Sequence, residues 1–184
     1  MRTYFLIFTS LFFTSLVCAQ TPGQNFCSGN VDGSYFPLDI KKKKIIWSNL
    51  HYLETNNGTV TFNGKDYQEF LQEWSQGTVD TLYLREENGI TYQLDEITGK
   101  ETIRLNPFLE KGATWTGQSI FTEYKIVSRK AKLKTPFCSY TDLLAVKATY
   151  ANGGGTYTFY YLKGYGYVGA TTKKGVISYV TPKF

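Results

Sequence analysis

The chain has 184 residues, of which 42% are hydrophobic, and its 20 Lys and Arg residues outnumber 15 Asp and Glu residues to give a net charge of +5. This length suits one domain with a substantial core, so disulfides are not obligatory for folding. The charge is uneven, because residues 20–123 hold 9 basic and 14 acidic residues whereas residues 124–184 hold 10 basic residues and one acid. The basic half suits an acidic polysaccharide, an anionic surface or a protein, unless the two halves neutralise each other across a sheet. No nucleic-acid-binding motif is present, so nucleic acid is not an expected partner.

Residues 1–19 have the pattern of a signal peptide. Arg2 provides the positive start, the apolar segment 4–17 follows, and the small residues before Gln20 suit cleavage at that point. The apolar segment is too short for a permanent membrane helix, and no transmembrane segment is expected after cleavage. We expect soluble export to the periplasm, cell surface or medium. Lipid attachment at Cys18 is the less favoured alternative, because Val17 is a poor neighbour for that processing.

Two cysteines, Cys27 and Cys138, remain in the mature segment 20–184, which we interpret as a single β domain. In an oxidising compartment an even pair favours a disulfide over two free thiols. The bond would close a loop of more than a hundred residues, which is worth about 4–5 kcal/mol in the chain-entropy model.

A run of lysines, Lys41 to Lys44, precedes the apolar residues of the next predicted strand. Lysines at this place typically protect an exposed sheet edge from pairing with other chains, which is the interpretation that we favour. Binding to an anionic surface is the alternative.

Alternation and turn residues dominate the chain from residue 44 onward. Leu82 and Leu84 alternate with polar residues, and after the Asn88-Gly89 turn Ile90 begins another alternating run. A period of two separated by such turns predicts an antiparallel β-meander, and hence an all-β domain that forms a curved sheet, an open barrel or a sandwich. The candidate strands are 44–53, 59–63, 79–86, 89–95, 100–105, 113–117, 119–129, 143–151, 155–163, 165–171 and 175–181.

Residues 66–75 fit two interpretations. Tyr67, Phe70, Leu71 and Trp74 have the spacing of one helix face, which predicts a short helix packed on the sheet. The same residues suit a strand that is partly covered on both faces.

Residues able to carry catalysis are few. His51 is the only histidine, which excludes histidine-based metal sites, and we interpret it as a half-buried strand residue. No G-x-S-x-G nucleophile elbow is present. The pairs Glu86-Glu87 and Asp95-Glu96 do not make glycosidase dyads alone, because adjacent strand residues face opposite sides. We therefore assign no catalytic, metal-binding or cofactor-binding residue, while carboxylates from distant strands stay an alternative.

The aromatic residues near the C-terminus are the candidate ligand site. Tyr157, Phe159 and Tyr161 share one face of a predicted strand, and Tyr165 and Tyr167 follow. A tyrosine has a flat apolar body and a polar tip, which suits a sugar-binding platform or a protein contact. The alternative is a core strand whose hydroxyls reach the rim.

Gly164, Gly166 and Gly169 have the G-x-G-x-x-G spacing of a dinucleotide fingerprint. That site needs a helix after the glycines and an acidic residue about twenty positions on. Here the glycines are interleaved with tyrosines, residues 170–184 contain no acid, and another strand is predicted. We interpret the glycines as relief of crowding at a bend or bulge, and we expect no nucleotide.

Four segments, NGKDYQEF, ITYQLDEITGKETIRLNPFLEKGATW, KTPFCSYTDLLAVKATY and YYLKGYGYVGA, resemble blocks of a loose family of small exported bacterial β-proteins. The family motif F-P-L-x-x-G-x-x-W is met here with its proline displaced by one position, and Gly164 and Gly166 fit the terminal Y-Y-x-x-G-x-G-x-V. The resemblance implies an extended curved sheet, often surface-linked, without an assigned activity, and it favours a strand over 66–74. The structural motif residues that match F-P-L-x-x-G-x-x-W are Pro107, Leu109, Gly112 and Trp115.

Together these observations favour an exported, non-enzymatic binding or structural module of the bacterial envelope. Its partner would be a glycan or an envelope protein, contacted through a tyrosine-rich sheet face. A carboxylate-dependent hydrolase and a protein-binding adaptor or inhibitor are the alternatives.

Overall fold

The computed structural model describes residues 26–29, 31–119, 121–151 and 153–184. The predicted signal peptide, residues 1–19, lies outside these described residues. The described part is built from twelve strands and contains no helix long and apolar enough to cross a membrane. The strands are β1 (Lys42–Trp47), β2 (Leu50–Phe62), β3 (Lys65–Trp74), β4 (Val79–Glu87), β5 (Ile90–Asp95), β6 (Lys100–Leu105), β7 (Thr114–Thr116), β8 (Thr122–Lys134), β9 (Ser139–Tyr150), β10 (Gly155–Leu162), β11 (Gly166–Thr172) and β12 (Gly175–Thr181).

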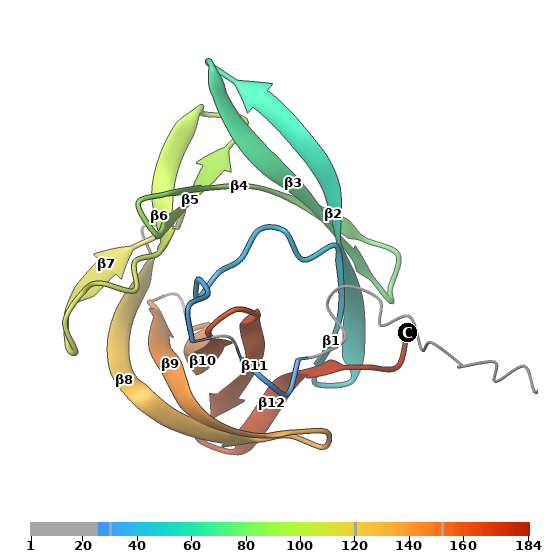
Figure 1. Ribbon diagram of the computed structural model, residues 1–184, viewed down its shortest axis with the longest axis vertical. Coiled ribbons are helices and arrows are strands. Elements are labelled where there is room, and N and C mark those ends of the chain that lie inside the picture. Colours follow the sequence, from blue (N-terminus) through green and yellow to red (C-terminus); the bar gives the residue numbers. More distant parts are fainter. Residues whose placement is uncertain (1–25, 30, 120, 152) are drawn as a thin grey trace, which may run out of the picture.

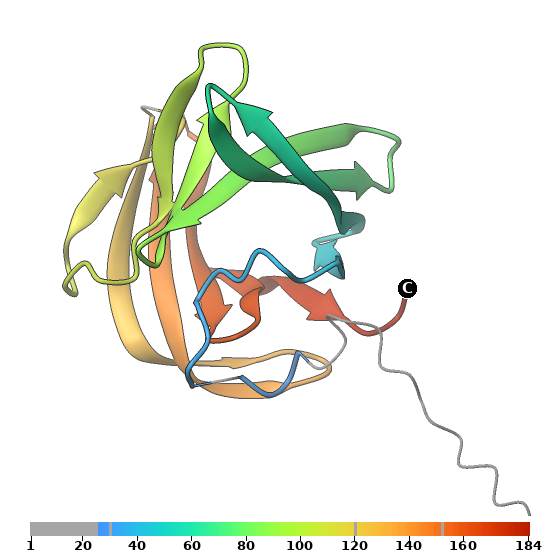
Figure 2. The same ribbon diagram turned by 45° about the horizontal axis from the view of Figure 1, so that its top comes forward.

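The strands form one antiparallel meander whose order is β6-β5-β4-β3-β2-β1-β12-β11-β10-β9-β8-β7. The first and last strands pair, with Ile45 opposite Val180, so the sheet curls until only β6 and β7 stand at its two ends. Figures 1 and 2 show the resulting nearly closed, barrel-shaped sheet. Closing a sheet in this way removes most of the exposed edge that a flat meander would present. The predicted all-β meander is confirmed, in its open-barrel form.

The predicted strand 44–53 is two strands joined by a tight turn. Ser48 adopts a positive φ of 55°, and Trp47 pairs with Leu50 across the turn. The prediction that the lysine run protects a sheet edge is wrong, because β1 pairs with β2 on one side and β12 on the other. Lys43 points inward from this central strand and is only 6% exposed.

Residues 65–74 form strand β3, so the strand alternative is confirmed and the helix alternative is not. Successive side chains alternate between faces, which places Tyr67 and Phe70 on opposite sides of β3. Both are nevertheless buried. The hydroxyl of Tyr67 donates to Glu101 of β6, whereas Phe70 lies opposite Asn56 and Leu82 of the two neighbouring strands. The helix-like spacing therefore arises from burial on both faces of one strand.

An N-terminal strap, residues 26–29 and 31–41, crosses the ring of strands before β1 begins (Figure 1). The Gly164 amide donates to the carbonyl of Ser34 over 2.7 Å, and the Asn56 amide donates to the carbonyl of Lys41 over 2.9 Å. The strap is thus joined to the β10–β11 turn at one point and to β2 at another. Phe36, between these points, reaches the interior and lies 6.0 Å from the Tyr161 ring.

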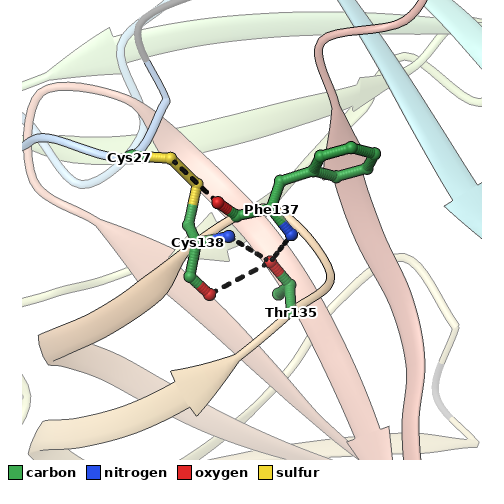
Figure 3. Close-up of a disulfide and its surroundings, with 4 residues drawn as sticks. All are labelled: Cys27, Thr135, Phe137 and Cys138. Atoms are coloured by element: carbon green, nitrogen blue, oxygen red, sulfur yellow. Dashed lines mark hydrogen bonds between the residues drawn. A yellow bond between two sulfur atoms is a disulfide. The ribbon is translucent and has the colours of Figure 1, made fainter.

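A disulfide between Cys27 and Cys138 connects the strap to the turn between β8 and β9 (Figure 3), as predicted. The two Cα atoms are 5.4 Å apart across a sequence separation of 111 residues. Thr135 shapes the turn, because its hydroxyl accepts from the amides of Phe137 and Cys138 and donates to the Cys138 carbonyl. The cross-link therefore attaches to a turn that is already hydrogen-bonded in place.

The three glycines with fingerprint spacing lie in a hairpin and a strand. Gly164 and Gly166 adopt φ values of +75° and +89°, which side-chain-bearing residues rarely adopt. Gly169 lies inside β11, where a Cβ atom would stand 2.6 Å from the carbonyl oxygen of Ser178 on β12. The chain continues as strand from Gly166 to Thr172. The interpretation of these glycines as relief of crowding in a bend and a strand is confirmed.

Candidate functional site

The interior of the barrel holds a cavity of about 250 Å³, which we call the interior cavity. Its wall comes from the strap and from nine of the twelve strands, so it lies at the centre of the sheet's concave side. Nine of the thirteen lining residues are aromatic. The four others are Glu54, Gln72, Leu82 and Arg104.

The aromatic wall has two groups in close mutual contact. Tyr52 of β2 and Trp74 of β3 lie with ring centroids 4.6 Å apart. Trp47 of β1, the strand next to β2, lies 6.2 Å from Phe159 of β10. Flat rings at these separations gain from offset contacts and present apolar faces to whatever lies between them.

The candidate ligand face predicted from the sequence is partly assembled here. Phe159, Tyr161 and Tyr167 line the interior cavity. Tyr157 stands beside them, 5.9 Å from the Trp47 ring. Tyr165 belongs to a separate core, where its ring lies 6.0 Å from Phe26. Phe159, Tyr161 and Tyr167 therefore share the concave interior face of the barrel.

Arg104 reaches the cavity because of a β-bulge. On β5, Thr91 pairs with Leu105 and the next residue, Tyr92, pairs with Ile103, so Arg104 is the extra residue on β6. A bulge lets two consecutive side chains turn toward one side. Leu105 accordingly joins the interior core beside Ile126, while Arg104 lines the interior cavity.

The Arg104 guanidinium has no hydrogen bond or ion pair with any other described residue, and its Nε is buried without a partner. Arg104 also lines an adjoining cavity of about 160 Å³ that shares Tyr124 and Tyr150 with the interior cavity. The hydroxyl of Thr102, in this second cavity, is likewise buried without a partner. Because buried polar groups are normally paired, this concentration of unpaired groups marks the region as a candidate site.

Glu54 is the one acidic residue of the described cavity wall, and unlike Arg104 it has a hydrogen-bond partner. Gln72 donates to its carboxylate over 2.8 Å. Lys43 stands directly opposite it in the β1–β2 register. Burial lowers the pKa of Lys43, and the charge of Glu54 opposes that shift. The Lys43 ammonium also donates to the Tyr165 carbonyl over 2.9 Å. Glu54 thus has a hydrogen-bond donor within the fold, whereas Arg104 has no hydrogen-bond acceptor among the described residues.

Burial makes three of the cavity tyrosines harder to ionise. It raises the pKa of Tyr161 to about 12, and it raises the pKa values of Tyr52 and Tyr167 as well. For Arg104, burial lowers the pKa, but the neighbouring tyrosines, Tyr161 first, and Glu54 raise it by more. The pKa of Arg104 therefore stays above its ordinary value. The site is therefore an aromatic cavity with neutral hydroxyl groups, a permanent guanidinium cation and one carboxylate.

The structural motif residues surround this region without forming a site of their own. Trp115 stacks on the cavity residue Tyr124 at 5.6 Å. Pro107 is buried, Leu109 packs against the interior core, and Gly112, at a φ of +96°, donates its amide to Ile126. These positions support β8 from outside the cavity.

The remaining chemical candidates are dispersed. His51 is exposed on β2, not half-buried as predicted. A broader hollow is lined by Asp80, Asp95 and Glu96. Asp80 accepts from the Trp74 indole over 2.8 Å, and Asp95 accepts from two amides of its own turn. No group of three His, Cys, Asp or Glu residues suited to a metal ion occurs within the described ranges.

Sequence reasoning missed Arg104, Glu54 and the two tryptophans Trp47 and Trp74. The one available signal was a charged residue inside a strand whose neighbours are apolar, as at Arg104 in ETIRL. Alternation along a regular strand places adjacent residues such as Arg104 and Leu105 on opposite faces. The bulge that turns both toward the interior is set by the pairing of β6 with β5, which the sequence of β6 alone does not show.

The fold and the site together define a class: a twelve-stranded up-and-down sheet, nearly closed, with an aromatic cavity inside. No protein-family model matches the chain, and no curated protein matches it. A solved structure described as a putative lipoprotein from Parabacteroides distasonis is similar over 81% of this chain and 96% of that chain, with 12% identity and a TM-score of 0.40. A likeness at this level carries no information on ligand or activity. The resemblance to exported β-proteins stays a prediction.

Proposed function

We propose that the protein is an exported, non-enzymatic binding module that holds a small ring-shaped ligand in the interior cavity. The observation that carries this proposal is the cavity wall itself, in which nine aromatic side chains surround about 250 Å³ of space. Ligand sites in proteins are concave, mostly apolar and fitted with a few polar groups. The interior cavity has that composition, with Glu54, Gln72 and Arg104 as its polar side chains.

The size of the cavity limits the ligand. Its volume lies below the usual range of about 300–1,000 Å³ for sites that take drug-sized molecules. A single six-membered ring suits this space, such as one sugar unit or a simple aromatic compound. This modifies the expectation of a glycan or protein bound on a sheet face, because the aromatic face is the concave one.

Two features favour binding over hydrolysis, and one supports export. Glycoside hydrolysis generally needs two carboxyl groups beside the substrate, and the described wall of the interior cavity provides one, Glu54. The carboxylates of Asp80 and Asp95 are engaged elsewhere. The Cys27–Cys138 disulfide is typical of a protein that matures in an oxidising compartment such as the bacterial envelope.

The proposal is tested by filling the interior cavity with a larger side chain and measuring whether ligand binding is lost. Leu82→Trp places a larger side chain into the interior from β4, and Thr81→Trp places the same side chain on the neighbouring, exposed position. We expect isothermal titration calorimetry with a panel of monosaccharides and simple aromatic compounds to detect saturable binding to the wild-type protein. Thr81→Trp should keep that binding and Leu82→Trp should lose it.

Two outcomes would contradict the proposal. The first is no binding of any panel compound to the wild-type protein. The second is binding that Leu82→Trp leaves unchanged while circular dichroism shows the variant to be folded, because the ligand would then lie outside the interior cavity.

A further inference from the structure

The charged side chains around the cavity are not joined in ion pairs. Glu54 and Arg104 line the interior cavity, and Lys43 stands opposite Glu54 across the β1–β2 ladder. The charge of Glu54 raises the pKa of both Lys43 and Arg104, and Asp39 also acts on Lys43. Arg104 comes from β6, four strands from β2 in the sheet order. Among the described residues, no carboxylate forms an ion pair or a hydrogen bond with its guanidinium.

A guanidinium without a hydrogen-bonded carboxylate inside a barrel lowers the stability of the fold. Guanidinium groups away from bulk water are normally paired with a carboxylate or phosphate, because desolvation of an isolated charge is strongly unfavourable. The protein could have placed a neutral side chain at position 104, since the bulge would turn any residue inward. The N–H donors of the Arg104 guanidinium instead face tyrosine side chains and two adjoining cavities.

We propose that the ligand of the interior cavity carries one carboxylate, which the guanidinium of Arg104 binds while the ring of the ligand packs against the aromatic wall. This inference rests on the proposed function and names the chemical class of its ligand. The planar fork of a guanidinium matches the two oxygens of a carboxylate. The negative charge of Glu54 in the same cavity disfavours a dianion such as a phosphate monoester, so a monoanion fits best.

Glu54 and Gln72 give the ligand a second polar contact. Gln72 uses one amide hydrogen on Glu54, and the carboxylate of Glu54 keeps further lone pairs as acceptors. A hydroxyl group on the ring would satisfy them. Two kinds of compound share the required chemistry: a sugar acid, which has many hydroxyls, and an aromatic acid, which has few.

Two matched pairs of probes test the inference on the mature wild-type protein. Benzoate is compared with benzamide, and glucuronate with glucose, by isothermal titration calorimetry. In each pair the ring is the same and only one member carries the anionic group. We expect at least one acid to bind at least tenfold more tightly than its neutral partner. The pair in which this occurs identifies an aromatic acid or a sugar acid as the ligand type.

The variants assign the effect to one residue. Arg104→Met should bring the preference for the acid below twofold, and Arg104→Lys should keep part of it, because the charge stays but the two-pronged geometry is lost. Arg129→Met is the matched control and should change nothing, since exposed Arg129 donates to the Leu109 carbonyl and lines neither of the two cavities that Arg104 lines. Denaturant unfolding of each variant shows whether it is folded before it is titrated.

The outcomes separate the inference from the proposed function. If probes bind but neither acid binds more tightly than its neutral partner, the cavity binds rings and the carboxylate inference is overturned. A preference for the acid that survives in folded Arg104→Met overturns the inference as well. If none of the four probes binds, the inference is overturned, and the proposed function is contradicted as well only if no compound of the wider panel binds.

Discussion

Glu101 is the residue at which the charged groups of the outer sheet face meet. Arg85 donates to its carboxylate through Nε and, over 3.0 Å, through Nη2. Lys65 reaches it over 2.5 Å and the hydroxyl of Tyr67 over 2.9 Å. The hydrogen bonds from Arg85 hold the pKa of Glu101 at about 2, against an ordinary value of 4.5. A network of this kind contributes more than an isolated surface pair.

The pKa of Glu101 predicts a loss of stability in acid. Because the folded-state pKa lies below the unfolded one, the contribution is complete above pH 4.5 and is lost as the pH falls toward 2. A shift of this size corresponds to about 3 kcal/mol without solvent screening. The carboxylate is 19% exposed, so we expect about 1–2 kcal/mol.

Urea unfolding of wild-type protein and Glu101→Gln between pH 2 and 6 measures this contribution. The variant should be less stable than wild type at pH 6 and nearly equal to it at pH 2. Glu73→Gln, an exposed position on β3, is the control and should follow the wild-type curve. A difference between Glu101→Gln and wild type that does not change with pH would refute the assignment.

At the scale of elements, the turns of the chain could be predicted better than its pairings. Asn88-Gly89 and similar signals predict hairpins from local chemistry, and β4, β5 and β6 lie within one residue of their predicted bounds. Ser48-Asn49 is a weaker turn signal than Asn-Gly, and the bulge at Arg104 is set by the pairing with β5. The fold class therefore followed from the sequence, whereas of the cavity wall only Phe159, Tyr161 and Tyr167 did.

The second prediction concerns the strap and its disulfide. The bond joins Cys27 to Cys138 across 111 residues, so its removal frees a large loop in the unfolded chain. Removing a native disulfide typically costs about 2–5 kcal/mol. For a chain of this length, that corresponds to a fall in the melting temperature of roughly 5–15 °C.

The double variant Cys27→Ser/Cys138→Ser measures this effect by calorimetry, with wild-type protein in a strong reductant as the matched control. Both samples should melt at the same lowered temperature and keep the circular dichroism of a β-sheet, because the strap is also held at Ser34 and Lys41. An unchanged melting temperature in both samples would show that the cross-link does not stabilise the fold.

At the scale of the whole molecule, several tyrosines are buried by the closing of the sheet, some around the cavity and some in the adjacent core. Tyr161 and Tyr167 line the cavity, and Tyr140 and Tyr165 belong to the adjacent core. Burial raises the pKa of each of these four phenols. The interior is therefore protected from alkali only while the sheet stays closed.

Alkaline unfolding follows from this arrangement. A group whose folded-state pKa is raised contributes stability below its unfolded value, near pH 10, and that contribution is lost as the pH rises toward the folded value. Tyr161 alone, raised to about 12, accounts for about 3 kcal/mol. The lowered pKa of Lys43 acts in the opposite direction, but it is one group against four. Absorbance at 295 nm should therefore rise in one steep step above pH 10, together with the loss of near-ultraviolet circular dichroism. Independent titration of all tyrosines near pH 10 in a protein that keeps its circular dichroism would contradict a closed, tyrosine-filled barrel.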